Sequence, residues 1–450
     1  MSFGFALAYL IVEYVRPQEA YPALSSIPFA LITILGLALS FLLEGRVINT
    51  RNLCNKLIVA YLVWFFVSYL NAFRQDLALQ PLLNFGKLVI TYYLLINSIN
   101  DRVRLYVFTI TLLVLNFKYA QFAVAIWAAS GFYSDPRGLN AGGGIGSGFF
   151  NNPNDFGAAM SSVLGLSYSM IFSDLHKILS LRMKWFHALA TVAIGLAILA
   201  SSSRGSAVGL GATALTAIIK SKHKTIAFVM LCVVALGFVA LIPDDNWKRF
   251  QVAGSQEDDS TQTRVTAWLA GIRMGNEFPL TGVGPSNFTH VNMNIYMSSN
   301  PFVQHNVFIQ AFSELGYPGL LLFVGMILGC FYNNRYTRKL LAEKQLKDPF
   351  LIGLSHGLDL CLVGFIVNGF FITVLYYPMF WIIMILSVAL HDVVQRIVVS
   401  AETKSNLESF PTQWNWRKAS FEGISAGPPR NFMKICQDTP LGRAGRNGSP

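Results

Sequence analysis

The chain has 450 residues and a formal net charge of +11, and its composition is strongly apolar. Hydrophobic residues make up 53% of it and charged residues only 13%, with a mean hydropathy of +0.48. Soluble domains carry about 25% charged residues. These values exclude an ordinary soluble protein and predict an all-α, polytopic transmembrane helical bundle. The basic residues then indicate orientation in the bilayer, and no nucleic-acid partner is expected.

Hydropathy predicts about twelve membrane spans, of which the first is short. They cover residues 2–14, 26–44, 57–73, 83–99, 105–130, 155–173, 186–201, 205–219, 225–242, 303–333, 350–373 and 378–395. The N-terminal stretch has neither a basic leader nor a small-residue cleavage site, so we expect it to be retained as a span.

Loop charge predicts the orientation of these spans. The loops on one side, such as that with Lys220, Lys222 and Lys224, carry twice as many Lys and Arg residues as the loops on the other. Positive loops face the cytoplasm. We therefore expect a multi-pass protein of a bacterial inner membrane, with both termini cytoplasmic and the long loop 243–300 periplasmic.

Four regions follow along the chain. Residues 1–130 form N-terminal transmembrane helices, residues 131–335 form a core that includes the loop 243–300, and residues 336–397 form C-terminal transmembrane helices. Residues 398–450 are polar and rich in Pro, Gly, Ser and Asn, which predicts a disordered cytoplasmic tail. The five cysteines have no CxxC or Cys/His spacing, so neither a disulfide framework nor a zinc site is expected.

Two polar turns on the outer face contain arginines. The glycine-rich segment 135–155 includes Arg137, which could hold an anionic head group; otherwise the segment is a lid or re-entrant loop, with Asn154 or Asp155 capping the next helix. The turn SSSRGS at 201–206 includes Arg204, the only charge between Lys184 and Lys220. Arg204 is either a snorkelling residue or an anion ligand supported by nearby hydroxyls and helix amides.

The large outer loop contains a predicted amphipathic helix. Acids and hydroxyls at 257–261 are helix-start signals, and an apolar face of Val265, Trp268, Leu269 and Ile272 follows. We expect this face to rest on the outer membrane interface. Arg264 is expected in the first turn, as a solvated residue or as a substrate ligand. Arg273, nine residues later, should point in a different direction.

The stretch from 301 to 323 leads from a polar entrance into an apolar run. His305 at the entrance is either a packed interfacial residue or a group that positions or deprotonates a hydroxyl. Asn306 lies beside it. Glu314, nine residues later, would face the other way on a straight helix, unless the Gly316/Pro318 kink re-aims it. The sequence has no HExxH motif, so neither a metal site nor a cofactor is predicted.

Four segments together resemble the bacterial O-antigen ligase and O-antigen polymerase family. They are NNPNDFGAAM at 151–160, SSSRGSAVGL at 201–210, TRVTAWLAGIRMGNEFPLTGVGPSNF at 263–288 and HNVFIQAFSELGYPGLLLF at 305–323. The order of these segments also matches that of the family. The resemblance covers residues 130 to 335, and the earlier spans match only as a hydropathy pattern.

The resemblance implies a membrane glycosyltransferase with a GT-C-like fold that works without metal or nucleotide. The donor would be a glycan on undecaprenyl diphosphate, and the acceptor lipid A–core or a growing polysaccharide; other polysaccharide-assembly proteins are candidate partners. The family's catalytic positions correspond to Arg204, Arg264 and His305. We further expect Arg137, Arg273, Asn306 and Glu314 to contribute to substrate binding.

Two other functions fit the composition. A transporter or flippase for a lipid-linked or small solute would place its polar residues near the midplane, often within internal repeats. Here the polar motifs gather at one face, and the sequence shows no repeat. A non-catalytic subunit of a glycan-assembly complex is the third possibility. The motifs do not separate a ligase from a polymerase.

Overall fold

The computed structural model of the chain describes residues 1–45, 49, 51–132, 152–173, 177–178, 181–220, 259–299 and 303–408, and single positions between 224 and 236. The chain divides into two units, Met1–Val398 and Val399–Pro450. Within the second unit, only residues 399–408 are described, as the end of a helix. The candidate site lies wholly in the first unit.

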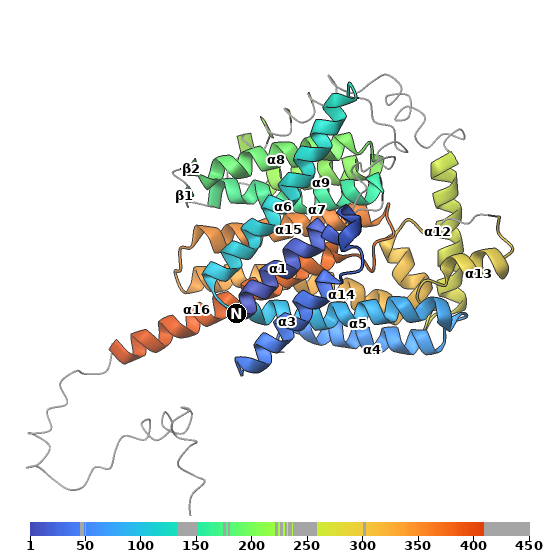
Figure 1. Cartoon of the computed structure of the whole chain (residues 1–450), viewed down its shortest axis with the longest axis horizontal. Coiled ribbons are helices and arrows are strands. Elements are labelled where there is room, and N and C mark those ends of the chain that lie inside the picture. Colours follow the sequence, from blue (N-terminus) through green and yellow to red (C-terminus); the bar gives the residue numbers. More distant parts are fainter. Residues whose placement is uncertain are drawn as a thin grey trace, which may run out of the picture. The chain divides into compact units, whose positions relative to one another are not determined.

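The described residues are almost entirely helical (Figure 1). The elements are α1 (Ser2–Val15), α2 (Pro17–Ala20), η1 (Pro22–Leu24), α3 (Phe29–Leu43), α4 (Leu53–Leu70), α5 (Gln75–Ser98), α6 (Arg102–Ala129), α7 (Pro153–Ser173), β1 (Lys177–Ile178), β2 (Leu181–Arg182), α8 (Met183–Ala200), α9 (Arg204–Lys220), α12 (Asp259–Glu277), α13 (Phe288–Asn294), α14 (Val307–Glu343), α15 (Pro349–Gly369) and α16 (Pro378–Glu408). The strands β1 and β2 form a short antiparallel hairpin.

The helices confirm a polytopic membrane fold. Within the described residues, eight helices are long and apolar enough to cross a membrane, namely α4 to α8 and α14 to α16. The helices α1, α3 and α9 are shorter, with 14, 15 and 17 residues. Every expected span except the ninth coincides with a helix. The ninth, at 225–242, lies outside the described residues apart from a few single positions.

Small residues let α7, α9 and α15 pack closely (Figure 1). A Cβ atom at Gly165 in α7 would lie 2.2 Å from Leu360 Cβ in α15, and one at Gly209 in α9 would lie 2.0 Å from Asn368 Nδ2. Close backbone approach at small residues is how transmembrane helices gain packing energy where no water drives their association. These three helices therefore form a tight bundle, which α8 joins through α7.

Aromatic side chains link α4, α14, α15 and α16. Phe380 of α16 contacts Phe323 and Phe365 with ring centroids 5.4 and 5.3 Å apart, and Trp381 lies 6.4 Å from Tyr61. All five rings are almost fully buried. Offset and tilted aromatic pairs add packing energy beyond the area that they bury. The start of α16, and the loop before it, are thereby held against the other helices.

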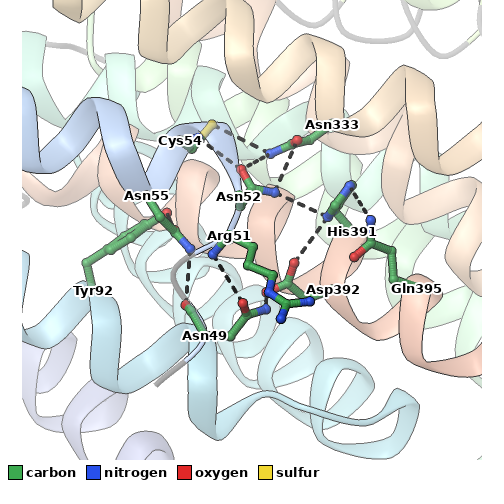
Figure 2. A network of polar contacts seen from close by, with 10 residues as sticks. All are labelled: Asn49, Arg51, Asn52, Cys54, Asn55, Tyr92, Asn333, His391, Asp392 and Gln395. Carbon is green, nitrogen blue, oxygen red and sulfur yellow. Dashed lines mark hydrogen bonds and ion pairs between the residues drawn. The ribbon is translucent and has the colours of Figure 1, made fainter. Parts of the chain in front are cut away.

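A polar network joins α4, α14 and α16 at the end of the bundle away from the outer loop (Figure 2). Asn52 and Asn333 exchange amide hydrogen bonds of 3.1 and 3.3 Å, and Asn52 also contacts His391 at 3.2 Å. Asn49 donates to Asp392 at 3.0 Å. Asn333 lies roughly 28 Å along α14 from Glu314 at 1.5 Å per residue. The two ends of the bundle thus carry separate polar clusters.

Candidate active site at the outer loop

His305 lies immediately before α14, in a constrained backbone conformation. Its φ is 48°, and its backbone N–H donates to Thr373 Oγ1 at 2.9 Å. The next residue, Asn306, caps α14 by accepting hydrogen bonds from the amides of Phe308 and Ile309 at 2.9 and 3.1 Å. Positive φ at a non-glycine residue is uncommon and concentrates at functional sites. The helix cap and the hydrogen bond to Thr373 together fix the backbone of His305, from which the imidazole extends.

Arg264 lies on the face of α12 that packs against α14. A Cβ atom at Gly271 would lie 2.4 Å from Ile309, and one at Gly275 would lie 2.4 Å from the Phe312 ring. Arg264 precedes Gly271 by about two turns of 3.6 residues, so the two share a face. The helix begins at Asp259, which places Arg264 in the second turn and not the first. The expectation of a first-turn arginine was wrong because the acidic run is already helical at Asp259.

Burial, and next the nearby charge of Arg264, together lower the pKa of His305 to about 4. Desolvation disfavours the charged imidazolium, and so does a neighbouring cation. Folding therefore brings Arg264 close enough to His305 for their charges to interact. It also keeps the imidazole neutral at neutral pH, able to accept a proton or a hydrogen bond.

The loop 370–377 between α15 and α16 connects His305 with the arginine turn. Thr373 holds the backbone of His305, as described above. Two residues earlier, Phe371 covers Gly205, where an added Cβ would lie 2.7 Å from Phe371 Cβ. Gly205 follows Arg204, the first residue of α9. The turn that carries Arg204 and the entrance that carries His305 are thus docked two residues apart on one loop.

The outer loop and the helix kink interlock through backbone contacts. Val283 N donates to Ser313 O at 2.9 Å, Gly284 N to Glu314 O at 3.1 Å, and Tyr317 N to Pro279 O at 2.8 Å. These bonds join the PLTGVG turn of the outer loop to the ELG segment of α14, two motifs far apart in the sequence.

Two glycines allow the PLTGVG turn and the ELG segment to approach each other this closely. Gly282 and Gly316 have φ of 63° and 70°; a Cβ atom at Gly282 would lie 2.4 Å from Glu314 C, and one at Gly316 would lie 2.1 Å from Leu280 O. Only glycine combines a left-handed backbone with contacts this short. The kink at Gly316 therefore lies where the outer loop docks, and it comes after Glu314.

The Glu314 carboxylate holds three segments together. Its Oε1 accepts from Gln304 Nε2 at 3.1 Å, and its Oε2 accepts from the Ser286 amide at 2.9 Å and from the Tyr376 hydroxyl. Burial, and next the charge of Glu314, raise the pKa of Tyr376, so its hydroxyl stays protonated and donates. Glu314 is 3% exposed. It links the histidine entrance, the outer loop and the loop 370–377, which is the geometry of a positioning residue.

Arg273 lies on the face of α12 opposite to that of Arg264. Its Nε donates to Glu277 Oε1 at 2.7 Å, and its guanidinium lies 4.2 Å from the centre of the Tyr296 ring. Its side chain is 62% exposed. The structure thus brings Arg264 and His305 together and places Arg273 elsewhere, as the nine-residue spacing predicts. Arg137 lies outside the described residues.

Three further features of the described residues bear on the expectations: the cap of α7, the apolar face of α12 and the grouping of possible metal ligands. The helix α7 is capped by Asn152, whose Oδ1 accepts from the Asp155 amide at 3.0 Å, and not by Asn154 or Asp155. The apolar face of α12 is present, with Val265, Leu269 and Ile272 exposed. Its contact with the membrane interface stays a prediction. In the part of the chain that the structure describes, no three His, Cys, Asp or Glu side chains are grouped to hold a metal ion.

The sequence reasoning missed Gln304, Ser286, Thr373 and Tyr376. The last two belong to TVLYYP, where a threonine, two tyrosines and a proline interrupt two apolar runs, and this was the available signal. The sequence around Gln304 and Ser286 gives no such signal, because the roles of both residues depend on their tertiary contacts.

Comparison with known families gives two matches. Residues 189–324 match the family described as O-antigen ligase, and residues 2–172 match a family of unknown function. No curated protein matches the chain. The first match includes Arg204, Arg264, His305 and the kink at Gly316.

Proposed function

We propose that this chain, whose residues 189–324 match the O-antigen ligase family as its motifs predicted, is a membrane glycosyltransferase that transfers a glycan from undecaprenyl diphosphate. The acceptor is lipid A–core or a growing polysaccharide, and the reaction takes place on the periplasmic face of the inner membrane. The observation that carries this proposal is that Arg264 lies near enough to His305 for their charges to interact, beside the loop on which the Arg204 turn docks.

In the proposed reaction, an acceptor hydroxyl attacks the anomeric carbon of the donor glycan. A new carbon–oxygen bond forms, and the bond from that carbon to the diphosphate oxygen breaks. Negative charge grows on the departing diphosphate, where Arg204 and Arg264 bind it. Arginine suits this role because its planar guanidinium donates two parallel hydrogen bonds to phosphate oxygens.

His305 receives the proton of the acceptor hydroxyl. A pKa of about 4 in the unoccupied protein makes it a weak base, so it first orients the hydroxyl as a hydrogen-bond acceptor. Arrival of the diphosphate offsets the charge of Arg264 and raises the pKa of His305, since a nearby anion favours the imidazolium. Basicity at His305 is thereby coupled to donor binding.

The test uses purified protein, a defined undecaprenyl-diphosphate glycan and two acceptors, lipid A–core and a second lipid-linked glycan. Arg204→Ala, Arg264→Ala and His305→Ala should each reduce transfer by about 100-fold or more, in the range for removed transition-state stabilisation. Arg273→Ala is the matched control and should stay within about twofold of wild type, since Arg273 contacts Glu277 and Tyr296. Undiminished transfer in the three folded variants would refute the proposal. The acceptor that yields product separates a ligase from a polymerase.

A further inference from the structure

A cavity of about 360 Å³ lies between the C-terminal ends of α7 and α9 and the first half of α15. Its volume falls within the range of about 300–1,000 Å³ typical of ligand pockets. It is far from the candidate active site, because α9 starts at Arg204 and reaches the cavity at Lys220, roughly 24 Å along the helix axis. The cavity therefore faces the opposite membrane leaflet.

The walls of this cavity are amphipathic. The apolar part consists of Tyr168, Phe172, Ala217, Ile352 and Leu360, and the polar part of Ser169, Ser173, Lys220 and His356. Tyr168, Ala217 and Leu360 are buried and form a small hydrophobic cluster of their own. The cavity thus offers an apolar wall beside a set of polar and basic side chains.

The mouth of the cavity carries an excess of positive charge. Asp359 Oδ2 lies 2.8 Å from Arg338 Nη2 and 3.8 Å from Lys220 Nζ. Asn334 donates to the other oxygen of Asp359 at 3.0 Å. One buried carboxylate therefore faces two cations, and the closer arginine already neutralises it. The Lys220 side chain is 49% exposed, and Lys222 and Lys224 follow it in the sequence.

We propose that this cavity binds an anionic phospholipid of the leaflet opposite the active site, which loop charge predicts to be the cytoplasmic one. The phosphate contacts Lys220 and the hydroxyls of Ser169 and Ser173, and an acyl chain packs against the apolar wall at Phe172 and Ile352. Basic pockets between transmembrane helices on the cytoplasmic side bind anionic head groups in this way. A soluble anion would leave the apolar wall unused, so the lipid is the better occupant.

This inference is independent of the glycosyltransferase activity, and its test uses binding alone. The full-length protein in detergent is titrated with dioleoylphosphatidylglycerol or dioleoylphosphatidylcholine, and bound lipid is counted by native mass spectrometry. Phosphatidylglycerol should bind at least fivefold more tightly. Lys220→Gln should lower that affinity about fivefold, as expected for one cation near a charged surface, and Lys220→Arg should retain it.

Lys339→Gln is the matched control, since Lys339 is 70% exposed at the same end of the bundle and pairs with Glu343. It should leave lipid affinity unchanged. Thermal unfolding of each variant without added lipid checks folding, and Asp359 keeps Arg338 as its partner when Lys220 is replaced. Equal affinity for the two lipids, an unaffected Lys220→Gln variant, or the same loss in Lys339→Gln would overturn the proposal. Equally tight binding of soluble glycerol phosphate would also overturn it.

Discussion

Replacing Tyr376 by Phe tests whether Glu314 ties the loops of the candidate site together. The hydroxyl donates to a buried carboxylate that also accepts from Ser286 and Gln304. Hydrogen bonds to charged groups contribute about 1.5–3 kcal/mol each. Tyr376→Phe should therefore lower the free energy of unfolding by about 2 kcal/mol, while Glu314 keeps two of its three partners.

Glu314→Gln removes the charge and should weaken all three contacts, so its loss should be larger. In the double variant, the effect of Tyr376→Phe should shrink, with a coupling of about 1–2 kcal/mol, because the two groups are direct partners. Stability is measured by thermal and denaturant unfolding in detergent, and transfer rates are measured in parallel. Both variants should lose transfer through a lower kcat, since the diphosphate and acceptor groups are misplaced. Additive effects on stability, or full transfer by Glu314→Gln, would refute the positioning role.

Further predictions concern the loop interlock, the helix cap and the histidine. Gly282→Ala should lower stability by about 1–3 kcal/mol, because φ is 63° and the new Cβ would lie 2.4 Å from a backbone carbon. Gly211→Ala, inside α9 and with nothing within 4 Å of its added Cβ, should be neutral or slightly stabilising in the same unfolding assay, and equal losses in the two variants would contradict the interlock. Asn306→Ala should lower the free energy of unfolding by about 1 kcal/mol. Asn306→Asp should lower it much less, since the side-chain oxygen of either Asn or Asp can cap α14. Similar losses in both variants would contradict the capping role. The folded pKa of His305, about 4, lies below its ordinary value of 6.5. Its neutral form is thus favoured by folding, and its contribution to stability is complete above pH 6.5 and lost as pH falls toward 4. In a pH profile, kcat/KM should hold between pH 8 and 5.5, and a fall centred near pH 6.5 would contradict the neutral histidine.

Hydropathy and charge were sufficient to predict most of the described helices. Apolar runs separated by basic loops placed each described span on a helix, because bilayer thickness sets the length of an apolar run. The bounds were less accurate, since α5 begins at Gln75 and not at residue 83, and α14 and α16 extend past the expected ends at 333 and 395. Helical spacing also predicted that Arg264 and Arg273 diverge, which depends only on 3.6 residues per turn. These properties are local, so one stretch of sequence determines each of them.

The long-range contacts of the site could not be predicted in the same way. Glu314 seemed poorly placed for His305 on a straight helix, yet His305 lies outside α14 and Glu314 instead holds Gln304, Ser286 and Tyr376. The glycines Gly282 and Gly316 gave turn signals, but their mutual docking depends on tertiary contacts. The roles of residues far apart in sequence emerge only when the outer loop folds onto the kink.

The most direct measurement of the central claim is a cryo-electron microscopy structure of the protein with undecaprenyl diphosphate bound. The account predicts density for the diphosphate in contact with the guanidinium groups of Arg204 and Arg264. The His305 imidazole should face the open side, where an acceptor hydroxyl would arrive. Diphosphate density at Arg273, or Arg204 and Arg264 too far apart to contact one diphosphate, would contradict it.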